Sequence, residues 1–428
     1  MASGIQDKRF LIYCLIGGMS KRNVLILADS FPPGFAPRMG YLSKYLSRYD
    51  WEGEAIFIAQ SDIYNFERLV GYIPSYQAGK YEEDATGSLF QSVKKNLQRF
   101  FSKDWVWSSF DTQIYQTAIP VLKEKKVDLI LCSTSSFFPL EVAYKLSEKF
   151  HLPLLLDFRD IYEQSENSFQ GALKTRIKTS LYKWKRNRII GRANAVISVS
   201  PWHQEFLSHY NQNSHLIYNG FDAEYFYPRD LVKTEKFTII YTGTVVPFND
   251  ISTRNPSWLF QAIAELFKNG KITAETFCVK FYTDPKSFPL LEKLSLEYEV
   301  SAFIKLEKWV KALQIPDILS SANVLLVLAA SSGTKGILTT KLFEYLAIGR
   351  TILCVPSDRA VIRDLLNDTS AGFAAATFED TYDFLLDKYE EWKRSGTVEC
   401  HADFERIKQF SREKQAGQFV EIFNQIVG

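Results

Sequence analysis

The stretch 339–347, with the sequence TTKLFEYLA, combines side chains that can hold a nucleotide. Thr339 and Thr340 stand before an apolar run, where their hydroxyls can cap the N–H groups that a helix start leaves without partners. A helix N-terminus attracts phosphate. Glu344 lies one turn further in, where its carboxylate can accept hydrogen bonds from ribose hydroxyls. Phosphate together with ribose indicates a nucleotide.

The elements around this stretch are equally well marked. Leu342, Phe343 and Leu346 give the expected helix a buried stripe. Gly349 follows and can end the helix in the left-handed conformation. Residues 351–356 then form an apolar run that is typical of a fully buried parallel strand. The candidate nucleotide-binding residues are therefore expected at the start of a helix that precedes a buried strand.

Strand-like runs alternate with helical patterns along the chain, in two sets. The first set is expected at 24–28, 55–59, 129–132, 154–158, 195–199 and 216–218. The second set is expected at 238–241, 278–282, 303–306, 324–328, 352–355 and 372–375. Continuous apolar strands joined by crossover helices predict parallel sheets that are covered on both faces. The sequence therefore predicts two doubly wound α/β domains, with the break near residues 227–230.

Ligands bind beyond the carboxyl ends of the strands in such domains, so the residues that follow strands are site candidates. After the first strand, Gly34 lets a ligand approach the backbone and Arg38 can reach a phosphate or an acceptor. An ordinary turn explains this segment equally well. Asp157, Arg159 and Asp160 stand at the end of a buried strand, where charges are costly unless they face a polar cleft. Their placement favours a functional role.

Three further segments follow strands of the two sets. Asn219 begins a turn signal. Gly243 and Thr244 form a small-residue turn where a phosphate can dock. Arg254 stands just before a helix that is expected to start at Pro256.

Composition excludes several classes of function. A chain of 428 residues with 46% apolar residues exceeds one typical domain and supports large cores. The net charge of +2 gives no overall attraction to nucleic acid. The five cysteines lie far apart, which argues against a metal site or a disulfide framework and favours a reducing compartment. The five histidines are expected in the core or on the surface, because none directly follows a strand.

The N-terminus contains an apolar run, 10–16, that is much shorter than the ~20 residues of a membrane span. No small-residue cleavage site follows it. Residues 1–18 are therefore interpreted as an extension upstream of the start, with a signal-like anchor as the alternative.

Six motifs resemble, in their order, those of the family 4 glycosyltransferases of the GT-B fold. They are Pro32-Pro33-Gly34 with Arg38, Phe158-Arg159-Asp160, Ser198-Val199-Ser200, Asn219-Gly220-Phe221-Asp222, Tyr241-Thr242-Gly243-Thr244 and the run 340–347. The resemblance implies two Rossmann-like domains that face each other across a cleft. It also implies retaining transfer from a nucleotide-sugar donor, bound by the second domain, to an acceptor on the first. The chain contains no Asp-x-Asp, the pattern that metal-dependent transferases use, which agrees with a transfer that needs no metal.

The resemblance sets the expected boundaries of the domains. Residues 1–18 form the extension, 19–228 the acceptor-side Rossmann-like domain and 229–405 the donor-binding Rossmann-like domain. Residues 406–428 form a C-terminal helix that crosses back and packs on the N-terminal domain.

The resemblance implies roles for single positions of the donor domain. Glu344 matches the second glutamate of the family's Glu-x7-Glu pattern, which is implied to bind the donor ribose. Thr340 and Lys341 match the segment at the diphosphate, and Gly243 matches the glycine after the first strand of that domain. Arg254 resembles the basic residue that is implied to neutralise the leaving diphosphate.

The first glutamate of that pattern is missing, and its position holds Gly336. Gly336 lies in the glycine-rich loop 331–338, whose backbone N–H groups are expected to hold the phosphates or the sugar instead. Two interpretations stay open. The protein can recognise other hydroxyls of the donor sugar, or it can be a homologue that has lost catalysis. The expected donor-binding residues are Gly34, Gly243, Thr244, Gly336, Thr340, Lys341 and Glu344.

A leaving diphosphate needs cationic side chains and helix N-termini when no metal is present. Arg254 and Lys335 are expected to act there with the helix that starts near Lys341. Retention without an evident enzymic nucleophile suggests that the acceptor attacks on the leaving-group face and that the β-phosphate takes its proton. Asp160 is the candidate that positions or helps to deprotonate the acceptor hydroxyl. The expected acceptor-side residues are Arg38, Asp157, Arg159 and Asn219.

The segment 172–192 carries eight basic residues and no acidic residue. Ile177, Leu181 and Trp184 share one helical face. A basic amphipathic helix with a tryptophan can lie on an anionic membrane, and a solvated helix packed on its own domain is the alternative. The expected membrane-surface residues are Lys183, Lys185, Arg186 and Arg188.

The leading hypothesis is an enzyme that moves a hexose or related sugar to a glycan or lipid-linked acceptor in cell-surface polysaccharide or lipopolysaccharide biosynthesis. A nucleotide-sugar epimerase of the same fold is less favoured, because the donor-side loop has no acid/base carboxylate or histidine. A non-catalytic binding subunit is the third hypothesis, motivated by Gly336. No cofactor, metal or nucleic acid is expected. The expected location is the cytoplasm, peripherally on the cytoplasmic face of the inner membrane.

Overall fold

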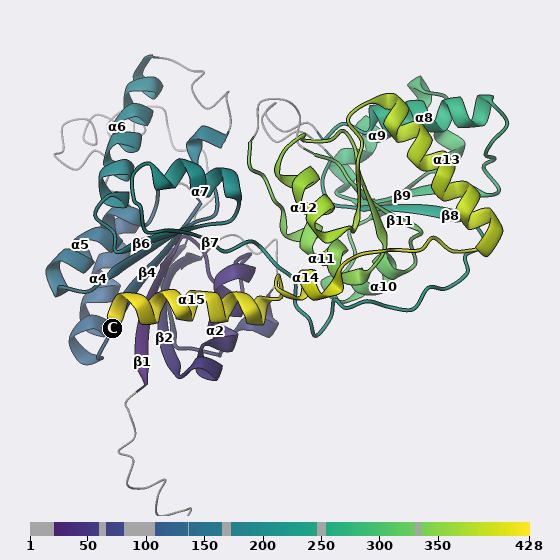
Figure 1. Cartoon of the computed structure of the whole chain (residues 1–428). Helices are drawn as coiled ribbons and strands as arrows, with labels where there is room; N and C mark the ends of the chain where they lie inside the picture. The colour runs from purple at the N-terminus through teal and green to yellow at the C-terminus, as the bar shows by residue number, and fades with distance from the viewer. Residues whose placement is uncertain are drawn as a thin grey trace, which may run out of the picture. The chain divides into compact units, whose positions relative to one another are not determined.

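The computed structural model describes residues 21–59, 66–80, 108–135, 137–164, 173–245, 254–329 and 335–428. The strands in these ranges form one sheet of seven strands and one of six (Figure 1). Two sets of strands, alternating with helices, are therefore confirmed. The expected extension 1–18 and the loop residues 331–334 lie outside the described residues.

The seven-stranded sheet has the order β3-β2-β1-β4-β5-β6-β7. Its strands are β1 (Arg22–Ala28), β2 (Trp51–Ala59), β3 (Ser75–Lys80), β4 (Leu129–Thr134), β5 (Leu154–Phe158), β6 (Ala195–Ser198) and β7 (Ser214–Leu216). The helices along this part of the chain are α2 (Pro37–Tyr45), α4 (Ser109–Glu124), α5 (Leu140–Phe150), α6 (Leu173–Ile190) and α7 (Pro201–Ser208). β1 pairs in parallel with both β2 and β4, and β4 is buried throughout, which explains why apolar runs predict these strands.

β3 does not coincide with any strand predicted from the sequence. This strand lies at the edge of the sheet, beside β2, and its residues are exposed or half-buried. Its sequence, SYQAGK, therefore contains no apolar run that could predict a strand.

The six-stranded sheet is parallel and has the order β10-β9-β8-β11-β12-β13. Its strands are β8 (Phe237–Thr242), β9 (Phe277–Thr283), β10 (Ile304–Lys308), β11 (Val324–Val327), β12 (Thr351–Cys354) and β13 (Gly372–Ala374). The helices of this part are α8 (Ser257–Lys268), α9 (Phe288–Glu297), α10 (Ile315–Ser320), α11 (Thr340–Ile348), α12 (Val361–Thr369), α13 (Phe378–Ser395) and α14 (Phe404–Lys408). The strands predicted near 238, 278, 324, 352 and 372 are thereby confirmed.

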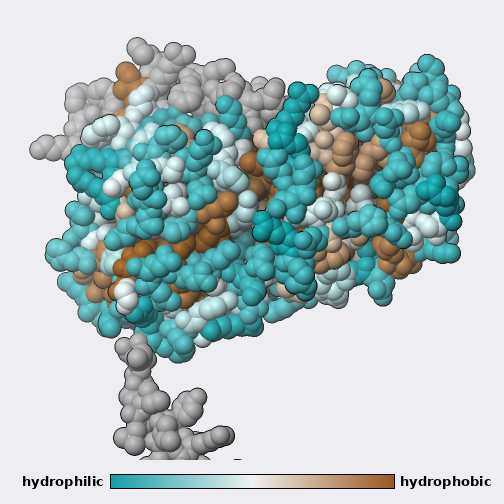
Figure 2. Space-filling view, in the orientation of Figure 1, coloured by the Kyte–Doolittle hydropathy of each residue, from teal (hydrophilic) through white to brown (hydrophobic). Residues whose placement is uncertain are grey.

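Helices cover both faces of this sheet, so its strands contribute side chains to two hydrophobic cores, one on each face. Ile239 and Tyr241 of β8 belong to a core shared with α8, α9 and α13. The intervening Ile240 belongs to a second core, shared with α10, α11, α12 and α14. This alternation is the physical reason for the continuous apolar runs of the second strand set. On the face that Figure 2 shows, most side chains are hydrophilic and apolar side chains form smaller patches.

The chain divides into two compact units. Residues 1–133, 138–155 and 420–428 form the first unit, and residues 134–137 and 156–419 form the second. The six-stranded sheet lies wholly in the second unit, which also contains β6 and β7. The domain boundaries expected at residues 18, 228 and 405 remain predictions.

The last helix, α15 (Arg412–Val427), ends in the first unit. Asn424 Oδ1 accepts hydrogen bonds from Arg22 Nη1 and from Trp51 Nε1, each at 3.1 Å. Phe423 packs against Trp51 with the ring centroids 5.0 Å apart. The end of the chain therefore returns to β1 and β2, as predicted for the C-terminal helix.

The turn after β7 contacts the segment that leads into α15. Phe221 N–H donates to Phe410 O at 3.2 Å, and Arg412 N–H donates to Phe221 O at 2.9 Å. An ideal Cβ on Gly220 would lie only 2.1 Å from Phe410 O. Glycine is therefore required here by the close approach of two backbones, which explains the turn signal in structural terms.

The segment after Pro228, where the sequence predicts a domain break, is fixed to the second sheet by Arg350. This buried guanidinium donates to Arg229 O and to Asp230 O at 2.8 Å each, and to Ser320 O at 3.0 Å. Gly349, directly before it, ends α11 with φ +73°, as predicted.

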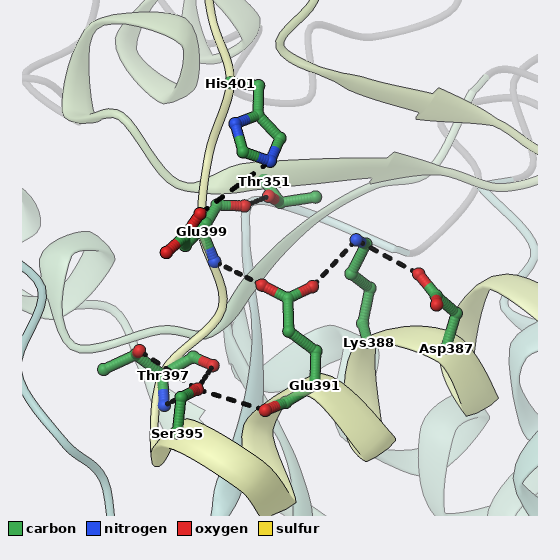
Figure 3. Close-up of polar contacts among 8 residues, drawn as sticks. All are labelled: Thr351, Asp387, Lys388, Glu391, Ser395, Thr397, Glu399 and His401. Atoms are coloured by element: carbon green, nitrogen blue, oxygen red, sulfur yellow. Dashed lines mark hydrogen bonds and ion pairs between the residues drawn. The ribbon is translucent and has the colours of Figure 1, made fainter.

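A polar network fixes the segment that follows α13 (Figure 3). Glu391 accepts hydrogen bonds from Glu399 N–H at 2.7 Å and from Lys388 Nζ at 2.9 Å. Thr351 Oγ1, on β12, donates to Glu399 O at 2.8 Å. The segment is thereby tied to both a helix and a strand of the six-stranded sheet.

Candidate active site

The turn after β8 is shaped to admit a lysine side chain. Gly243 has φ +125°, a conformation that residues with a Cβ rarely adopt. An ideal Cβ on Gly243 would lie 2.8 Å from Lys341 Nζ. Gly243 N–H donates to Tyr282 O at 3.0 Å, which ties the turn to β9. Any other residue at this position would therefore displace the ammonium group of Lys341.

Lys341, in the first turn of α11, brings its ammonium group to the carboxyl end of β8. Its Nζ donates to Tyr241 Oη and to Thr242 O, both at 3.1 Å, and lies 4.2 Å from the centroid of the Tyr241 ring. Among the described residues Lys341 has no ion pair. Desolvation lowers the pKa of Lys341 well below its usual value, Arg254 adds to this effect and Glu344 opposes it. A charged Lys341 therefore lacks a paired anion in the part of the chain that the structure describes.

Arg254 supplies a second cation at the same turn. Its Nη1 donates to Thr244 O at 3.1 Å. The start of α11 adds the positive end of a helix dipole. Three positive features thus meet at the end of β8, and such an arrangement favours an anion with more than one negative charge.

Tyr345 fixes α11 to this turn. Its Oη accepts a hydrogen bond from Thr242 N at 2.9 Å and shares another with Thr242 Oγ1 at 2.9 Å. Burial raises the pKa of Tyr345 well above its usual value, so the hydroxyl stays protonated. This role of Tyr345 is not predictable from the sequence, because an aromatic residue in an apolar helix indicates only core packing.

The start of α11 differs from the prediction in one respect. Thr339 occupies the N-cap position, but its side chain makes no cap hydrogen bond. The prediction that this threonine caps the helix is therefore wrong, and its hydroxyl satisfies none of the first N–H groups. Thr340 is the first helical residue, and Glu344 lies half-buried one turn after Lys341. Contact of Glu344 with a ribose remains a prediction.

The segment before α11 is pressed against α7. Lys335 N–H donates to Gln164 O at 2.8 Å. Gly336 has φ +70°, and an ideal Cβ there would lie 2.9 Å from Ser200 Oγ and 3.0 Å from Trp202 Cβ. A glutamate at position 336 would therefore be strained and would collide with α7.

Asp160 is linked to this segment through Gln164. Gln164 Nε2 donates to Asp160 Oδ1 at 3.1 Å, and Gln164 Oε1 lies 2.9 Å from His203 Nε2. Burial lowers the pKa of His203 to about 4, so its ring is neutral at physiological pH. His203 is a core residue, as expected of the histidines. The structure therefore brings Asp160, Lys335 and Gly336 together, through contacts that no sequence signal indicates.

The two expected site residues after β1 belong to the first unit. Gly34 N–H donates to Phe31 O at 3.0 Å, so Gly34 forms a tight turn. Arg38 is buried at the start of α2. The residues of α11 belong to the second unit, and the roles of Gly34 and Arg38 toward donor and acceptor remain predictions.

The other acceptor-side candidates follow β5 and β7. Asp157 is fully buried at the end of β5, and Arg159 N–H, just beyond it, donates to Thr134 O at 2.9 Å. Asn219 Nδ2 donates to Leu338 O at 3.0 Å. The Asn219 amide thus supports the segment that leads into α11. Roles of these residues toward an acceptor remain predictions.

The basic helix α6 has two of its four expected surface cations turned inward. Arg186 is fully buried and forms two hydrogen bonds to the Glu163 carboxylate, at 2.8 and 2.9 Å. Lys183 lies 3.4 Å from the same carboxylate. The assignment of Arg186 to a membrane surface is therefore wrong, and Lys183 is paired and largely buried as well. The sequence does not predict this pairing, because Glu163 lies outside the basic segment.

The outer face of α6 is apolar and basic. Trp184 is 57% exposed and Ile177 is 52% exposed. The Arg188 guanidinium lies over the Trp184 ring, 5.6 Å from its centroid, and is exposed. Lys185 is half-buried. These four residues are the part of the predicted membrane face that the structure leaves accessible.

None of the described helices combines the length and the apolar character that crossing a membrane requires. The described residues contain no group of three or more histidine, cysteine, aspartate or glutamate side chains that could hold a metal ion.

Comparisons with known proteins relate the chain to glycosyltransferases. Residues 87–225 match the sequence model of Glycosyltransferase Family 4. A search of curated proteins gives no significant match. Among solved structures, HepE from Anabaena, in complex with UDP, is 15% identical and aligns with a TM-score of 0.63. That alignment covers 94% of this chain and 100% of HepE.

Two further solved structures share the fold. The lipopolysaccharide outer core galactosyltransferase WaaB is 13% identical, with a TM-score of 0.58 over 94% of this chain and 99% of WaaB. The second is a Listeria monocytogenes protein assigned to the UDP-N-acetylglucosamine 2-epimerases. It is 13% identical and aligns with a TM-score of 0.52, over 94% of this chain and 95% of the Listeria chain. At such low identities the likeness establishes the fold.

The two Rossmann-like sheets and the structural likenesses show that the chain has the GT-B fold, and residues 87–225 within it match Glycosyltransferase Family 4. The predicted GT-B fold is therefore confirmed, and the predicted resemblance to family 4 is supported over residues 87–225.

Proposed function

We propose that this glycosyltransferase moves a sugar, with retention of configuration, from a nucleotide-sugar donor to a glycan or lipid-linked acceptor. The observation that carries the donor class is the turn after β8, where Lys341, Arg254 and the start of α11 gather positive charge. A nucleoside diphosphate supplies an anion for Lys341, which forms no ion pair with any of the described residues. HepE, crystallised with UDP and with UDP-glucose, supports a uridine nucleotide as the first donor to test.

The proposed chemistry follows from the placement of these cations. As the bond between the anomeric carbon and the β-phosphate oxygen breaks, negative charge develops on the phosphate. Lys341 and Arg254 stabilise that charge, in the place that a divalent metal takes in other transferases. The acceptor hydroxyl attacks the same face of the sugar, forms the new C–O bond and gives its proton to the departing phosphate oxygen.

Asp160 is the proposed residue that orients the acceptor hydroxyl. Its carboxylate is held by Gln164, which in turn contacts the neutral His203. A carboxylate fixed in this way can accept a hydrogen bond from an acceptor hydroxyl without itself needing to move. Lys335, beside Gln164, is the third proposed cation at the leaving group.

The pathway that we propose is cell-surface polysaccharide or lipopolysaccharide biosynthesis. WaaB, a lipopolysaccharide outer core galactosyltransferase, shares the fold and supports this choice. The outer face of α6 fits a lipid-linked acceptor, since Trp184 and Ile177 can enter an anionic interface while Lys185 and Arg188 attract its charge. We therefore place the protein peripherally on the cytoplasmic face of a membrane.

Incubation with UDP-glucose, UDP-galactose, UDP-N-acetylglucosamine and GDP-mannose tests the proposed activity. Slow release of free sugar with retained anomeric configuration, followed by proton NMR, is the expected result. An epimerised nucleotide sugar among the products would assign the site to an epimerase instead. Binding of nucleotides without any turnover, in the presence or absence of acceptor glycans, would make the chain a non-catalytic binding subunit.

A further inference from the structure

Trp202, in the first turn of α7, is the large side chain that lies against Gly336. An ideal Cβ on Gly336 would be 3.0 Å from Trp202 Cβ and 3.0 Å from Trp202 Cε3. Phe206 lies nearly parallel to the indole, with ring centroids 6.2 Å apart, and His203 meets it edge-on at 5.4 Å. The indole is therefore oriented by residues of its own helix.

These packing contacts leave part of the indole ring exposed and its N–H group without a hydrogen bond to any described residue. Trp202 is only half-buried, and its Nε1–H makes no hydrogen bond within the described part of the chain. By contrast, Trp51 Nε1 and Trp392 Nε1 donate to Asn424 and to Thr234. Trp202 thus keeps part of its ring exposed and has an Nε1–H donor to which no described residue is hydrogen-bonded.

An unpaired acceptor lies next to the indole. His203 Nδ1 is buried and has no hydrogen-bond partner among the described residues, while its Nε2 is used by Gln164. An unsatisfied buried polar atom is unfavourable, so such an atom calls for an explanation such as a bound water or ligand. The carboxylate of Asp160, held by Gln164, completes a group of polar atoms near an aromatic ring.

This combination matches the chemistry of a sugar. A pyranose presents C–H groups that pack on an aromatic face, and hydroxyls that need both donors and acceptors at its edge. The sugar of a nucleotide-sugar is bonded directly to the β-phosphate, and the segment from Lys335 to Gly336 leads directly into α11, where the diphosphate is proposed to bind. The cluster therefore lies where the chain approaches the phosphate-binding helix.

We propose that Trp202 is the platform on which the sugar ring of the donor lies, in a subsite completed by His203, Gln164 and Asp160. The proposal rests on the proposed function, because it places one part of the same donor. It also explains the missing glutamate, since Trp202 and Ser200 occupy the space that a side chain at position 336 would need. An aromatic surface takes the place of that carboxylate in holding the sugar.

Calorimetric titration of the full chain with UDP and with UDP-glucose tests the subsite. Trp202→Ala should weaken UDP-glucose binding by about tenfold, which corresponds to about 1.4 kcal/mol, and leave UDP binding unchanged. Trp202→Phe, which keeps a flat ring but loses the N–H, should give an intermediate loss. Trp309→Ala, an exposed tryptophan after β10, is the matched control and should change neither affinity.

The outcomes separate the subsite from the donor site. Equal weakening of UDP and UDP-glucose by Trp202→Ala would show that Trp202 only supports the loop, which overturns the subsite but leaves the nucleotide site in place. Unchanged binding of both ligands would overturn it in the same way. Thermal unfolding of Trp202→Phe checks that folding is intact. If wild-type protein binds no nucleoside diphosphate from a panel of UDP, GDP, ADP and dTDP, the proposed function and the subsite both fall.

Discussion

Replacing Lys341 with methionine separates the cost of a desolvated charge from its use at the donor site. Methionine keeps much of the side chain's apolar length and removes an ammonium group that has two oxygen acceptors and no ion pair among the described residues. The melting temperature of the free protein should therefore stay constant or rise. UDP affinity should fall by tenfold to a hundredfold, because a hydrogen bond to a charged group contributes about 1.5–3 kcal/mol.

The pH dependence of stability has a defined sign. Desolvation holds the pKa of Lys341 in the folded protein below its value in the unfolded chain. Between these two pKa values the unfolded state binds one more proton, so the free energy of unfolding rises with pH, by at most ~1.4 kcal/mol per pH unit. The full penalty is present below the folded pKa and is gone above the unfolded value of about 10.4. Lys341→Met should lack this rise.

Proton uptake on binding gives the decisive measurement. Above the folded pKa of Lys341, a bound diphosphate should restore the ammonium form, so UDP binding takes up a proton. Calorimetry in two buffers of different ionisation enthalpy detects this uptake, which Lys341→Met should lose. Lys286→Met, at an exposed lysine after β9, is the control and should behave as wild type. Equal proton uptake by wild type and Lys341→Met, or an unchanged UDP affinity, would refute the assignment of Lys341 to the diphosphate.

Three further predictions concern the ribose contact, the metal and the membrane. Glu344→Ala should weaken UDP binding tenfold to a hundredfold by calorimetry with the fold intact, and an unchanged affinity would remove its ribose role. Donor turnover should persist in excess EDTA, whereas a loss that Mg²⁺ or Mn²⁺ restores would contradict a site built on cationic side chains. Changing Trp184 to serine and Lys185 and Arg188 to glutamine should release the protein from anionic vesicles in flotation assays, since each basic residue contributes about 1 kcal/mol. Physiological salt, which screens charges over about 8 Å, should also release the protein. Lys126→Gln, at an exposed lysine outside α6, is the control and should leave vesicle binding unchanged. Wild-type protein that does not bind such vesicles at low salt would refute the membrane proposal.

The sequence predicted the fold well because buried parallel strands leave apolar runs that need no partner to be seen. The strands of both sheets that lie inside their sheet were found in this way, and α11 was marked at its end by Gly349. The edge strand β3 was missed because its exposed positions carry mainly polar residues, whereas the edge strands β10 and β13 overlap predicted ranges. Local patterns therefore report runs of apolar residues, which an edge strand can retain or lack.

The sequence predicted those site residues that a local motif marks. It did not predict residues whose role depends on a contact with a distant segment of the chain. Gly243 and Lys341 follow from motif positions, although their mutual contact spans about a hundred residues. Trp202 was missed because its meaning depends on Gly336, far along the chain. Arg186 was misassigned for the same reason, since a basic residue in a basic helix gives no sign of a buried partner such as Glu163.

The hydrogen bonds from Arg350 to the backbone after Pro228 limit where the chain can be divided into fragments. A fragment that began at Leu231, the first residue after the predicted break, would lose the carbonyls of Arg229 and Asp230 and leave a buried guanidinium with two acceptors fewer. Residues 229–230 are thus fixed to the domain that contains the six-stranded sheet and do not act as a flexible linker. Fragments meant to fold alone need to retain it, and fusion points or flexible insertions belong elsewhere in the sequence.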